Sequence, residues 1–427
     1  MNVLVTGLCL SRNLGGPAMG LTLMHELEKR FGKINFTFSI SPSDYQQELQ
    51  WATYYDVDIV RKELIIHSIP QYNMIRKLYR AYKRITSNAS VNYVEIHKEH
   101  MQAFQKADIV IDMSGISYVG DGSRPFLEAI GSFSNFYYSR KNNTPFFRFI
   151  QSFGPFSSFL FKYYARQEFK ALPFIPTRGK VSASYCKKII SDPEKVYDFP
   201  DVAILLPKAN AEWSNEYLRK KKLRAKQFVV LSPSAAIYKL PESFGGCTSE
   251  QYVQSFAKIA ESILKDEEVL FMPHMYSNNP RDCDREVCKK VISLITDKSL
   301  VSHIHLVEDD LDPMQAKALI STAKSAIVSR YHALVAALST STPVITIGWH
   351  AKYRDLMEYY ELEEQVVDIK DQSDQVERQV LSLYTALPLI PTESMTVCHQ
   401  RNIEQVNTAF DMLESAMRDT FEKEVIC

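Results

Sequence analysis

Short apolar runs alternate with amphipathic stretches along most of the chain. Apolar and β-branched runs predict strands at residues 2–6, 34–40, 107–113, 146–152, 228–231, 268–272, 304–306, 326–328 and 343–347. Helical spacing of apolar residues predicts helices at 17–31, 250–264, 283–296, 313–322 and 333–338. Because strands are repeatedly followed by helices, the pattern predicts an α/β protein with parallel sheets.

The strand–helix units recur in both halves of the chain. A chain of 427 residues is also longer than a domain with a single hydrophobic core usually is. We therefore predict two doubly wound, Rossmann-like domains facing a cleft. They are expected at residues 1–218 and 227–390, joined by a basic linker at 219–226, since a block of like charge resists burial. A final helical segment at 391–427 is expected to pack across the junction.

Composition excludes several classes of protein. Lys+Arg and Asp+Glu are both 50, so the chain lacks the basic footprint of a nucleic-acid-binding protein. The seven cysteines are scattered without paired C-x-x-C spacing, which disfavours a zinc site or a disulfide scaffold and indicates reduced thiols. No apolar run approaches the ~20 residues that span a bilayer. We therefore expect a soluble, cytoplasmic protein.

A basic and aromatic stretch at residues 71–87 leaves one question of location open. Its tyrosines, lysines and arginines interleave at helical spacing. Such a helix is either an ordinary solvated face or a contact with an anionic membrane surface. The second interpretation would bring the protein to the inner face of the membrane as a peripheral partner.

Residues 325–353 carry the most informative polar groups. Arg330 and His332 follow the strand at 326–328, and His350 and Lys352 follow the strand at 343–347. Ligands of open parallel sheets bind outside the carboxyl ends of the strands, so these side chains are expected to share one crevice. His332 also lies near a helix start, where unpaired N–H groups attract anions. The local pattern predicts a site for a small phosphate or carboxylate ligand.

Other strand ends carry further candidates, each with a plain structural alternative. Gly15 lies in a glycine-containing loop that lacks the dinucleotide G-x-G-x-x-G spacing and is also explained as a turn before a helix. Asp112 ends a buried strand and either reaches a ligand or caps the following loop. His274 follows another strand, where a hydrogen-bonded structural histidine is equally explicable.

Taken together in order, these motifs resemble the polysaccharide pyruvyl transferases over most of the chain, from about residue 3 to 352. The matching positions are Asn13, Gly15, Asp112, Ser114, Gly115, Gln151, Ser152, Gly154, Pro155, Arg178, Ser182, Pro200, Asp201, Pro273, His274, Arg330, His332, Pro343 and Lys352. Two positions depart from the family pattern. Gly16-Pro17 stands where an acidic residue is usual, and Ser114-Gly115 stands where a Gly-Gly pair is common.

The resemblance implies a two-domain, glycosyltransferase-B-like fold and a specific reaction. Such an enzyme transfers a pyruvyl group from phosphoenolpyruvate to a sugar of a cell-surface polysaccharide, such as a capsule or exopolysaccharide, or of its lipid-linked precursor. A ketal forms and phosphate is released. Phosphoenolpyruvate is the donor substrate, a saccharide is the acceptor, and no metal or other cofactor is expected.

The resemblance also implies roles for individual residues. Arg330 and Lys352 are expected to bind the donor from the C-terminal domain, and Arg178 to close the site from the N-terminal domain. Ser114, Gly115, Asn13 and Gly15 are further substrate-binding candidates. His332 or His274 is expected to be the general acid, because histidine titrates near neutrality, and Asp112 or Asp121 the base.

Two other functions remain open from the sequence. A nucleotide-sugar-dependent glycosyltransferase would use the same architecture. An acidic residue for the ribose hydroxyls would favour it, but Gly348-Trp349-His350 follows the strand at 343–347. A non-catalytic sugar-binding relative is the other alternative, because of the departures at Gly16-Pro17 and Ser114.

Overall fold

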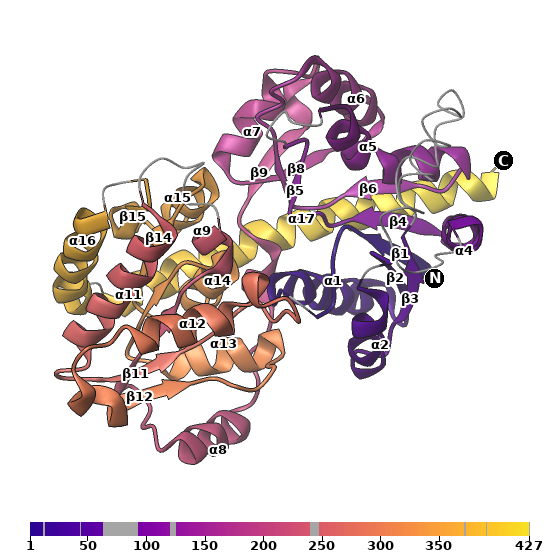
Figure 1. The fold of residues 1–427 in the computed structure, drawn as a ribbon. Coiled ribbons are helices and arrows are strands. Elements are labelled where there is room, and N and C mark those ends of the chain that lie inside the picture. The colour runs from indigo at the N-terminus through magenta and orange to yellow at the C-terminus, as the bar shows by residue number, and fades with distance from the viewer. Residues whose placement is uncertain are drawn as a thin grey trace. The chain divides into compact units, whose positions relative to one another are not determined.

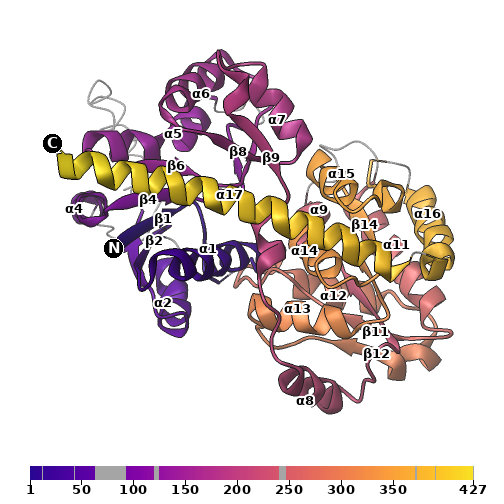
Figure 2. The same ribbon diagram turned by 180° about the vertical axis from the view of Figure 1, so that it is seen from behind.

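Two parallel sheets form the framework of the chain (Figures 1 and 2). The computed structural model describes residues 1–11, 13–42, 44–62, 93–119, 125–239, 247–370, 373–389 and 391–426. The basic stretch at 71–87 and Asp121 lie outside the described residues. Each sheet is surrounded by helices of its own compact unit, so the predicted α/β class is confirmed.

The chain divides into two compact units that are discontinuous in sequence. The first contains Met1–Leu10, Leu23–Phe199 and Asn407–Cys427, and the second contains Ser11–Thr22 and Pro200–Val406. The division therefore passes through two helices, α1 (Gly15–Phe31) and α17 (Thr392–Ile426).

The sheet of the first unit has the strand order β3-β2-β1-β4-β6, with all pairs parallel. These strands are β1 (Asn2–Thr6), β2 (Asn35–Ile40), β3 (Asp58–Arg61), β4 (Ile109–Asp112) and β6 (Phe146–Arg148). The order reverses between β1 and β4, which places a topological switch point at Thr6 and Asp112, directly paired in register.

Smaller sheets and helices complete the first unit. The pairs are β5 (Ile116–Ser117) with β7 (Ser152–Phe153) and β8 (Ile175–Arg178) with β9 (Val196–Phe199). The helices are α2 (Tyr45–Tyr54), α4 (Tyr93–Lys106), α5 (Pro125–Lys141), α6 (Phe159–Ala171), α7 (Lys180–Lys187) and η3 (Pro193–Lys195). The end of α17 belongs here too: Phe410 packs on Phe149, and Asp411 pairs with Arg30.

The sheet of the second unit has the strand order β12-β11-β10-β13-β14-β15, again all parallel. These strands are β10 (Phe228–Ser232), β11 (Glu268–Phe271), β12 (Ile304–Leu306), β13 (Ser325–Val328), β14 (Val344–Gly348) and β15 (Val366–Asp368). Its central strands β10, β13 and β14 are buried along their whole length, as expected for a sheet covered on both faces. The switch point lies between β10 and β13.

Helices connect these strands in the doubly wound manner. They are η4 (Val202–Leu205), α8 (Ala211–Lys221), α9 (Ala235–Lys239), α11 (Ser249–Ile263), η5 (Pro280–Asp282), α12 (Asp284–Ser293), η6 (Lys298–His303), α13 (Pro313–Thr322), α14 (Tyr331–Leu338), α15 (Ala351–Glu358), η7 (Glu363–Gln365), α16 (Ser373–Ala386) and η8 (Leu387–Leu389). Local sequence explains several starts. Thr248 with Gln251, and Asp312 with Gln315, form capping boxes at α11 and α13.

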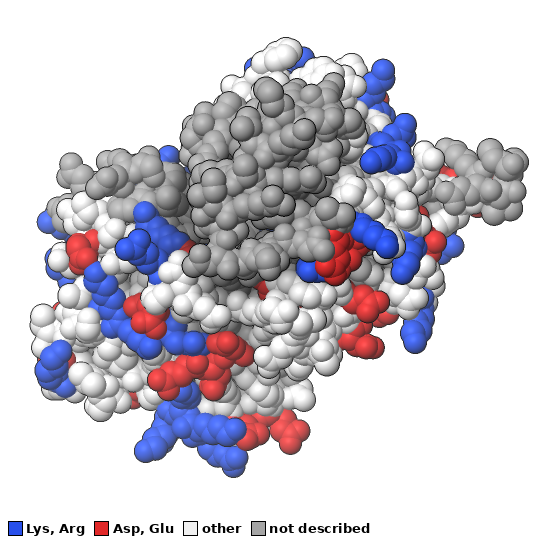
Figure 3. All heavy atoms as spheres, turned by 45° about the vertical axis from the view of Figure 1, so that its right-hand side comes forward, with Lys and Arg blue, Asp and Glu red and all other residues white. Residues whose placement is uncertain are grey.

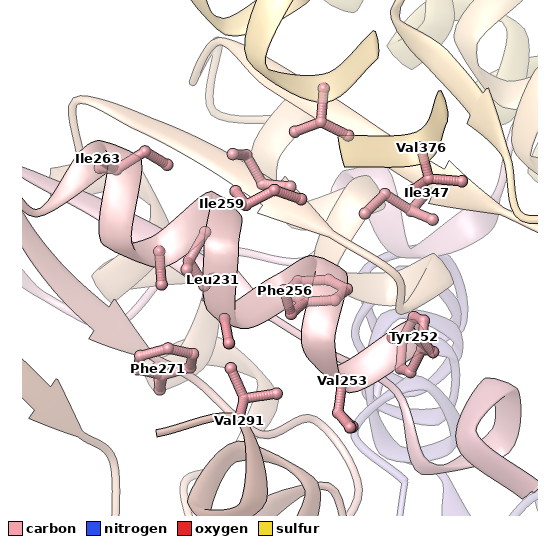
Figure 4. Packing of buried hydrophobic residues seen from close by; sticks show 14 of the residues in the cluster. Leu231, Tyr252, Val253, Phe256, Ile259, Ile263, Phe271, Val291, Ile347 and Val376 are labelled. Carbon is pink, nitrogen blue, oxygen red and sulfur yellow. The ribbon is translucent and has the colours of Figure 1, made fainter. Parts of the chain in front are cut away.

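One continuous hydrophobic cluster holds a face of this second sheet against helices α11, α12 and α16 (Figure 4). Tyr252, Phe256 and Ile263 of α11 belong to the same cluster as Leu231 and Phe271 of the strands. The spacing of the α11 residues is the helical period from which the element was predicted. The second sheet and its strand ends are therefore fixed by a dry, close-packed core.

The domain boundaries differ from those predicted. Residues 11–22 and 200–218 belong to the second unit, whereas they were assigned to the N-terminal domain. The basic run at 219–226 is no linker between units, because it starts in the last turn of α8 and lies within the second unit. Basic side chains favour that position because the carboxyl end of a helix carries partial negative charge.

The described surface matches the balanced composition. On the face drawn in Figure 3, basic and acidic side chains are interspersed among uncharged residues. No helix within the described residues is both long enough and apolar enough to cross a membrane.

We predict that Phe256→Ala destabilises the protein by about 3–5 kcal/mol, because the ring is fully buried and its removal leaves a cavity. Denaturant unfolding followed by circular dichroism measures the change. Val397→Ala is the control, since this side chain is 70% exposed, and it should change the free energy of unfolding by less than about 0.5 kcal/mol. Equal effects of the two substitutions would contradict the assignment of this core.

Candidate functional site

The carboxyl edge of the second sheet gathers most of the predicted site residues. Beyond β10 lies Ser234, beyond β11 lies His274, and beyond β13 lies Arg330, which directly precedes α14. The switch point between β10 and β13 therefore separates Ser234 from Arg330. This is where an open parallel sheet provides its binding crevice.

Arg330 is held by a buried carboxylate that the sequence did not single out. Its Nε donates to Asp284 Oδ2 at 2.7 Å, and its Nη2 donates to Asp284 Oδ1. Asp284, at the start of α12, also accepts from the backbone N–H groups of Ala235 (2.7 Å) and His274 (3.1 Å). Burial opposes the charged form of Arg330, but Asp284 outweighs it and raises the pKa of the guanidinium. The pair thus fixes a permanent cation at the sheet edge.

Only some of the N–H donors of the Arg330 guanidinium are therefore occupied. The bidentate pair with Asp284 occupies its Nε and Nη2 side, and the Nη1 side makes no hydrogen bond within the described part of the chain. A guanidinium held in this way presents Nη1 in a fixed direction. It is suited to bind one anionic oxygen rather than a whole carboxylate bidentately.

His332, in the first turn of α14, lies between two other segments of the second unit. Its Nε2 is 3.7 Å from Asp201 Oδ2, and Asp201 is a fully buried residue at the start of η4. A Cβ atom added at Gly15 would overlap the imidazole ring, so the ring packs directly on the glycine backbone. Gly15 is therefore explained by close approach to His332.

The loop before α1 is tied to the same place. The N–H of Leu14 donates to the carbonyl of His274 at 3.1 Å, and Asn13 forms a β-bridge with Met275. Asn13 Oδ1 accepts from the N–H of Gly15 at 3.1 Å. These contacts explain why residues 11–22 join the second unit, and they give Asn13 a role in shaping the loop.

His274 occupies a sealed environment at the end of β11. It is 2% exposed, and its Nδ1 lies 3.4 Å from Ser232 Oγ. Burial, with Arg330 and His332 nearby, lowers the pKa of His274 to about 3. At neutral pH the ring is uncharged, which favours a structural role over that of a proton donor.

Lys352 is positioned by aromatic rings. Its Nζ lies 5.0 Å from the ring centre of Tyr331, 5.6 Å from Tyr353 and 5.7 Å from Trp349. The hydroxyl of Tyr353 donates to the carbonyl of Ser329, the residue before Arg330. Cation–π contacts help to hold the ammonium in place. Lys352 is thus kept near Arg330 as a second cation.

A buried lysine that was not predicted from the sequence supports the segment that carries Asp201. Lys317 of α13 donates from Nζ to the carbonyls of Ile204 (3.1 Å) and Leu206 (2.6 Å), at the end of η4. Burial and Lys208 lower the pKa of Lys317 to about 7. It lines a cavity of about 20 Å³ together with His274 and His332. The position of Lys317 in its helix is that of any core-facing residue. Its contact with the η4 carbonyls is therefore visible only in the tertiary structure.

In the first unit, Asp112 is enclosed in a hydrogen-bonded network. It is fully buried and accepts from Thr6 Oγ1 (2.7 Å), Asn135 Nδ2 (2.7 Å) and Arg148 Nη1 (2.9 Å). Burial opposes its ionisation, but Arg148 and the neutral donors prevail and lower the pKa of Asp112 to about 2. A sealed carboxylate with so low a pKa is unsuited to be a general base. We therefore revise its expected role to that of a structural anchor.

Arg148 extends this network to a second buried acid. It pairs with Asp112 and with Glu168, both fully buried, and Tyr118 donates to Glu168 at 2.5 Å. Arg148 was not predicted as a site residue, because it ends an apolar strand, FFR, whose pattern predicts core packing. A buried cation needs such partners, since an uncompensated charge costs several kcal/mol.

The remaining first-unit candidates lie just beyond this anchor. The N–H of Ser114 donates to Asp112 Oδ1 at 3.1 Å, and a Cβ on Gly7 would overlap Ser114. Arg178, at the end of β8, donates from Nη2 to the carbonyl of Gly115 and from Nε to Ser152 Oγ at 3.3 Å. Ser114, Gly115 and Arg178 are thus neighbours, held by the switch point of the first sheet.

The predicted site residues therefore fall into two groups. Asn13, Gly15, His274, Arg330, His332 and Lys352 belong to the second unit, and Asp112, Ser114, Gly115 and Arg178 belong to the first. Within the ranges that the structure describes, no group of His, Cys, Asp and Glu has the arrangement of a metal site.

Comparisons with known proteins identify both the family and the fold of the chain. The model of the polysaccharide pyruvyl transferase family matches residues 13–351, which includes nearly all of these positions. No curated protein sequence is significantly similar to the chain.

Solved structures resemble the chain over almost its whole length. A UDP-N-acetylglucosamine 2-epimerase from Neisseria meningitidis has a TM-score of 0.56 at 12% identity, covering 98% of this chain and 100% of the epimerase. S. aureus MnaA, solved with UDP, has 0.57 at 11%, covering 92% and 90%. Anabaena HepE, also solved with UDP, has 0.55 at 9%, covering 98% and 100%. At such identities the likeness shows the fold alone, and it confirms two Rossmann-like domains of the glycosyltransferase-B kind.

We predict that His274 contributes to the acid sensitivity of the fold. The unfolded histidine binds a proton near pH 6.5, whereas the native one does so near pH 3. Between these values the unfolded state holds the extra proton, so stability is greatest above pH 6.5 and falls as the pH drops towards 3. His274→Gln should reduce this slope by up to about 1.4 kcal/mol per pH unit, measured by denaturant unfolding from pH 4 to 7. The exposed His25→Gln is the control, and an unchanged slope in His274→Gln would contradict the assignment.

Proposed function

Because the chain belongs to the polysaccharide pyruvyl transferase family, we propose that it transfers a pyruvyl group from phosphoenolpyruvate to two hydroxyls of one sugar. The acceptor is a sugar of a cell-surface polysaccharide or of its lipid-linked precursor. The observation that carries the proposal is the joining of Arg330, His332 and Lys352 at one sheet edge, with Arg330 fixed by Asp284.

The donor needs cations at fixed separation, because it carries both a carboxylate and a phosphate. Arg330 Nη1 and Lys352 Nζ supply two such donors. The N-terminal N–H groups of α14 add partial positive charge directly after Arg330. Arg330 is charged at all accessible pH values, and Lys352 acts as a point charge for phosphate.

The proposed reaction consists of a proton transfer and two attacks by hydroxyls. A general acid protonates the methylene carbon of phosphoenolpyruvate, which becomes a methyl group, and positive charge develops at the central carbon. One sugar hydroxyl adds to that carbon and passes its proton to the deprotonated general acid, which is thereby regenerated. The second hydroxyl then displaces phosphate, forming the second C–O bond of the ketal and losing its own proton to the departing phosphate. One phosphate is released for each ketal formed.

His332 suits the role of the general acid better than His274. It is partly exposed, whereas His274 is sealed and has a pKa of about 3. Asp201 Oδ2 lies 3.7 Å from His332 Nε2, which is longer than a hydrogen bond but close enough for the carboxylate to act as a counter-ion to an imidazolium. Lys317 holds the end of η4 and so supports Asp201.

We predict that the protein binds phosphoenolpyruvate in calorimetry and does not bind UDP-N-acetylglucosamine, which a glycosyltransferase would use. Arg330→Lys should weaken binding about 10- to 100-fold, since a charge-assisted hydrogen bond contributes about 1.5–3 kcal/mol. Arg219→Lys, an exposed residue of α8, is the matched control. Thermal unfolding of both variants checks that they are folded. Binding of the nucleotide sugar with no response to phosphoenolpyruvate would refute the donor assignment.

We predict that His332→Asn lowers kcat by about 10²- to 10⁴-fold, as expected for loss of a general acid, while phosphoenolpyruvate still binds. The measurement is acceptor-dependent release of phosphate, with trapping of the pyruvylated saccharide by mass spectrometry. His25→Asn should be unaffected. A wild-type protein that binds donor and saccharide but yields no product would instead support a non-catalytic sugar-binding protein.

A further inference from the structure

Helices α6 and α7 form a cationic surface on the first unit. From residue 142 to residue 191 the sequence contains a single acidic residue, Glu168. The same span holds exposed basic residues on both helices or at their ends: Lys162, Arg166, Lys170, Lys180, Lys187 and Lys188. The end of α7 lies next to α6, because Arg166 Nε of α6 donates to the carbonyl of Ile189, just after α7, at 2.7 Å. Both helices also pack on one hydrophobic cluster. We call this surface the α6–α7 face.

The one acidic residue does not reduce the charge of this face. Glu168 is fully buried and paired with Arg148, as described above. The nearest acidic residues that follow in sequence are Asp192 and Glu194, beside η3. Apart from the buried Glu168, helices α6 and α7 contain no acidic residue, in a protein whose overall charge is balanced.

The first turns of α6 also expose two aromatic rings. Phe159 is 75% exposed and Tyr163 is 48% exposed, and their rings stack with centroids 6.4 Å apart. The opposite side of α6 is anchored in the core by Phe161, Ala165 and Phe169. Phe159 is thus fixed in an outward direction by a rigid helix. Exposing a phenylalanine to this extent costs free energy unless a partner covers it.

We propose that the α6–α7 face docks onto an anionic lipid bilayer. Exposed aromatic residues next to lysines and arginines on an amphipathic helix are the combination that binds the membrane interface. The rings enter the headgroup region, and the cations lie at the level of the lipid phosphates. The contact is peripheral, and it does not depend on the proposed transfer reaction. This face is distinct in sequence from the basic stretch at 71–87, whose pattern also allows contact with a membrane surface.

The test is flotation of the full-length protein with vesicles of neutral phosphatidylcholine alone or with 30 mol% phosphatidylglycerol added. Each basic residue near an anionic surface contributes roughly fivefold to binding, so Lys162→Gln/Lys170→Gln/Lys187→Gln should weaken binding by roughly 100-fold. Phe159→Ser/Tyr163→Ser should also weaken it, with no loss of thermal stability because both side chains are exposed. Binding to anionic vesicles should decrease as salt is raised from 0.05 to 0.5 M.

The control variant removes the same number of positive charges from another part of the surface. Arg219→Gln/Lys220→Gln/Arg224→Gln, on and after α8, deletes three exposed cations from a segment that exposes no comparable aromatic pair. It should bind anionic vesicles like the unaltered protein. The proposal is overturned if the unaltered protein does not float with anionic vesicles, or if the control loses as much binding as the α6–α7 variant. It is also overturned if neutral vesicles bind equally well, or if the face binds only a soluble anionic polysaccharide.

Discussion

The second unit depends on one buried carboxylate, Asp284. It accepts both arms of Arg330 and the backbone N–H groups of Ala235 and His274, so it joins the segments that follow β10, β11 and β13. A lone carboxylate would not remain ionised in such a place, and a lone guanidinium would not remain buried. The charges of Asp284 and Arg330 compensate each other in the interior. Their pairing also fixes the direction in which Arg330 presents positive charge to the proposed donor site.

The first unit also buries charged groups, and it compensates them with a longer network of paired charges. Asp112, Arg148 and Glu168 are all buried, and Tyr118 and Asn135 satisfy their remaining lone pairs. In both units the switch point of the sheet therefore contains a paired buried carboxylate. Groups held in this way keep their positions while exposed loops move, which is what precise recognition of a small anion requires.

Features that depend on the local pattern of apolar and polar residues were predicted well from the sequence. The strands at 2–6 and 228–231 and the α11 helix follow from apolar periodicity, and Arg330 and His332 follow from their place after a strand. The sequence did not reveal Asp284, because an aspartate at a helix start is usually a simple cap. Nor did it reveal the domain boundaries, since the basic run at 219–226 belongs to the end of a helix and residues 11–22 join the second unit through tertiary hydrogen bonds.

The discontinuous units have a consequence for the order in which the protein is made. Residues 11–22 leave the ribosome long before the His274 segment to which they bind, and the first unit includes Asn407–Cys427, which are synthesised after residues 200–406 of the second unit. Domains that fold one after another during synthesis require contiguous stretches of chain. Here the core of the first unit lacks part of its packing, such as Phe410 on Phe149, until residues 407–427 have been synthesised.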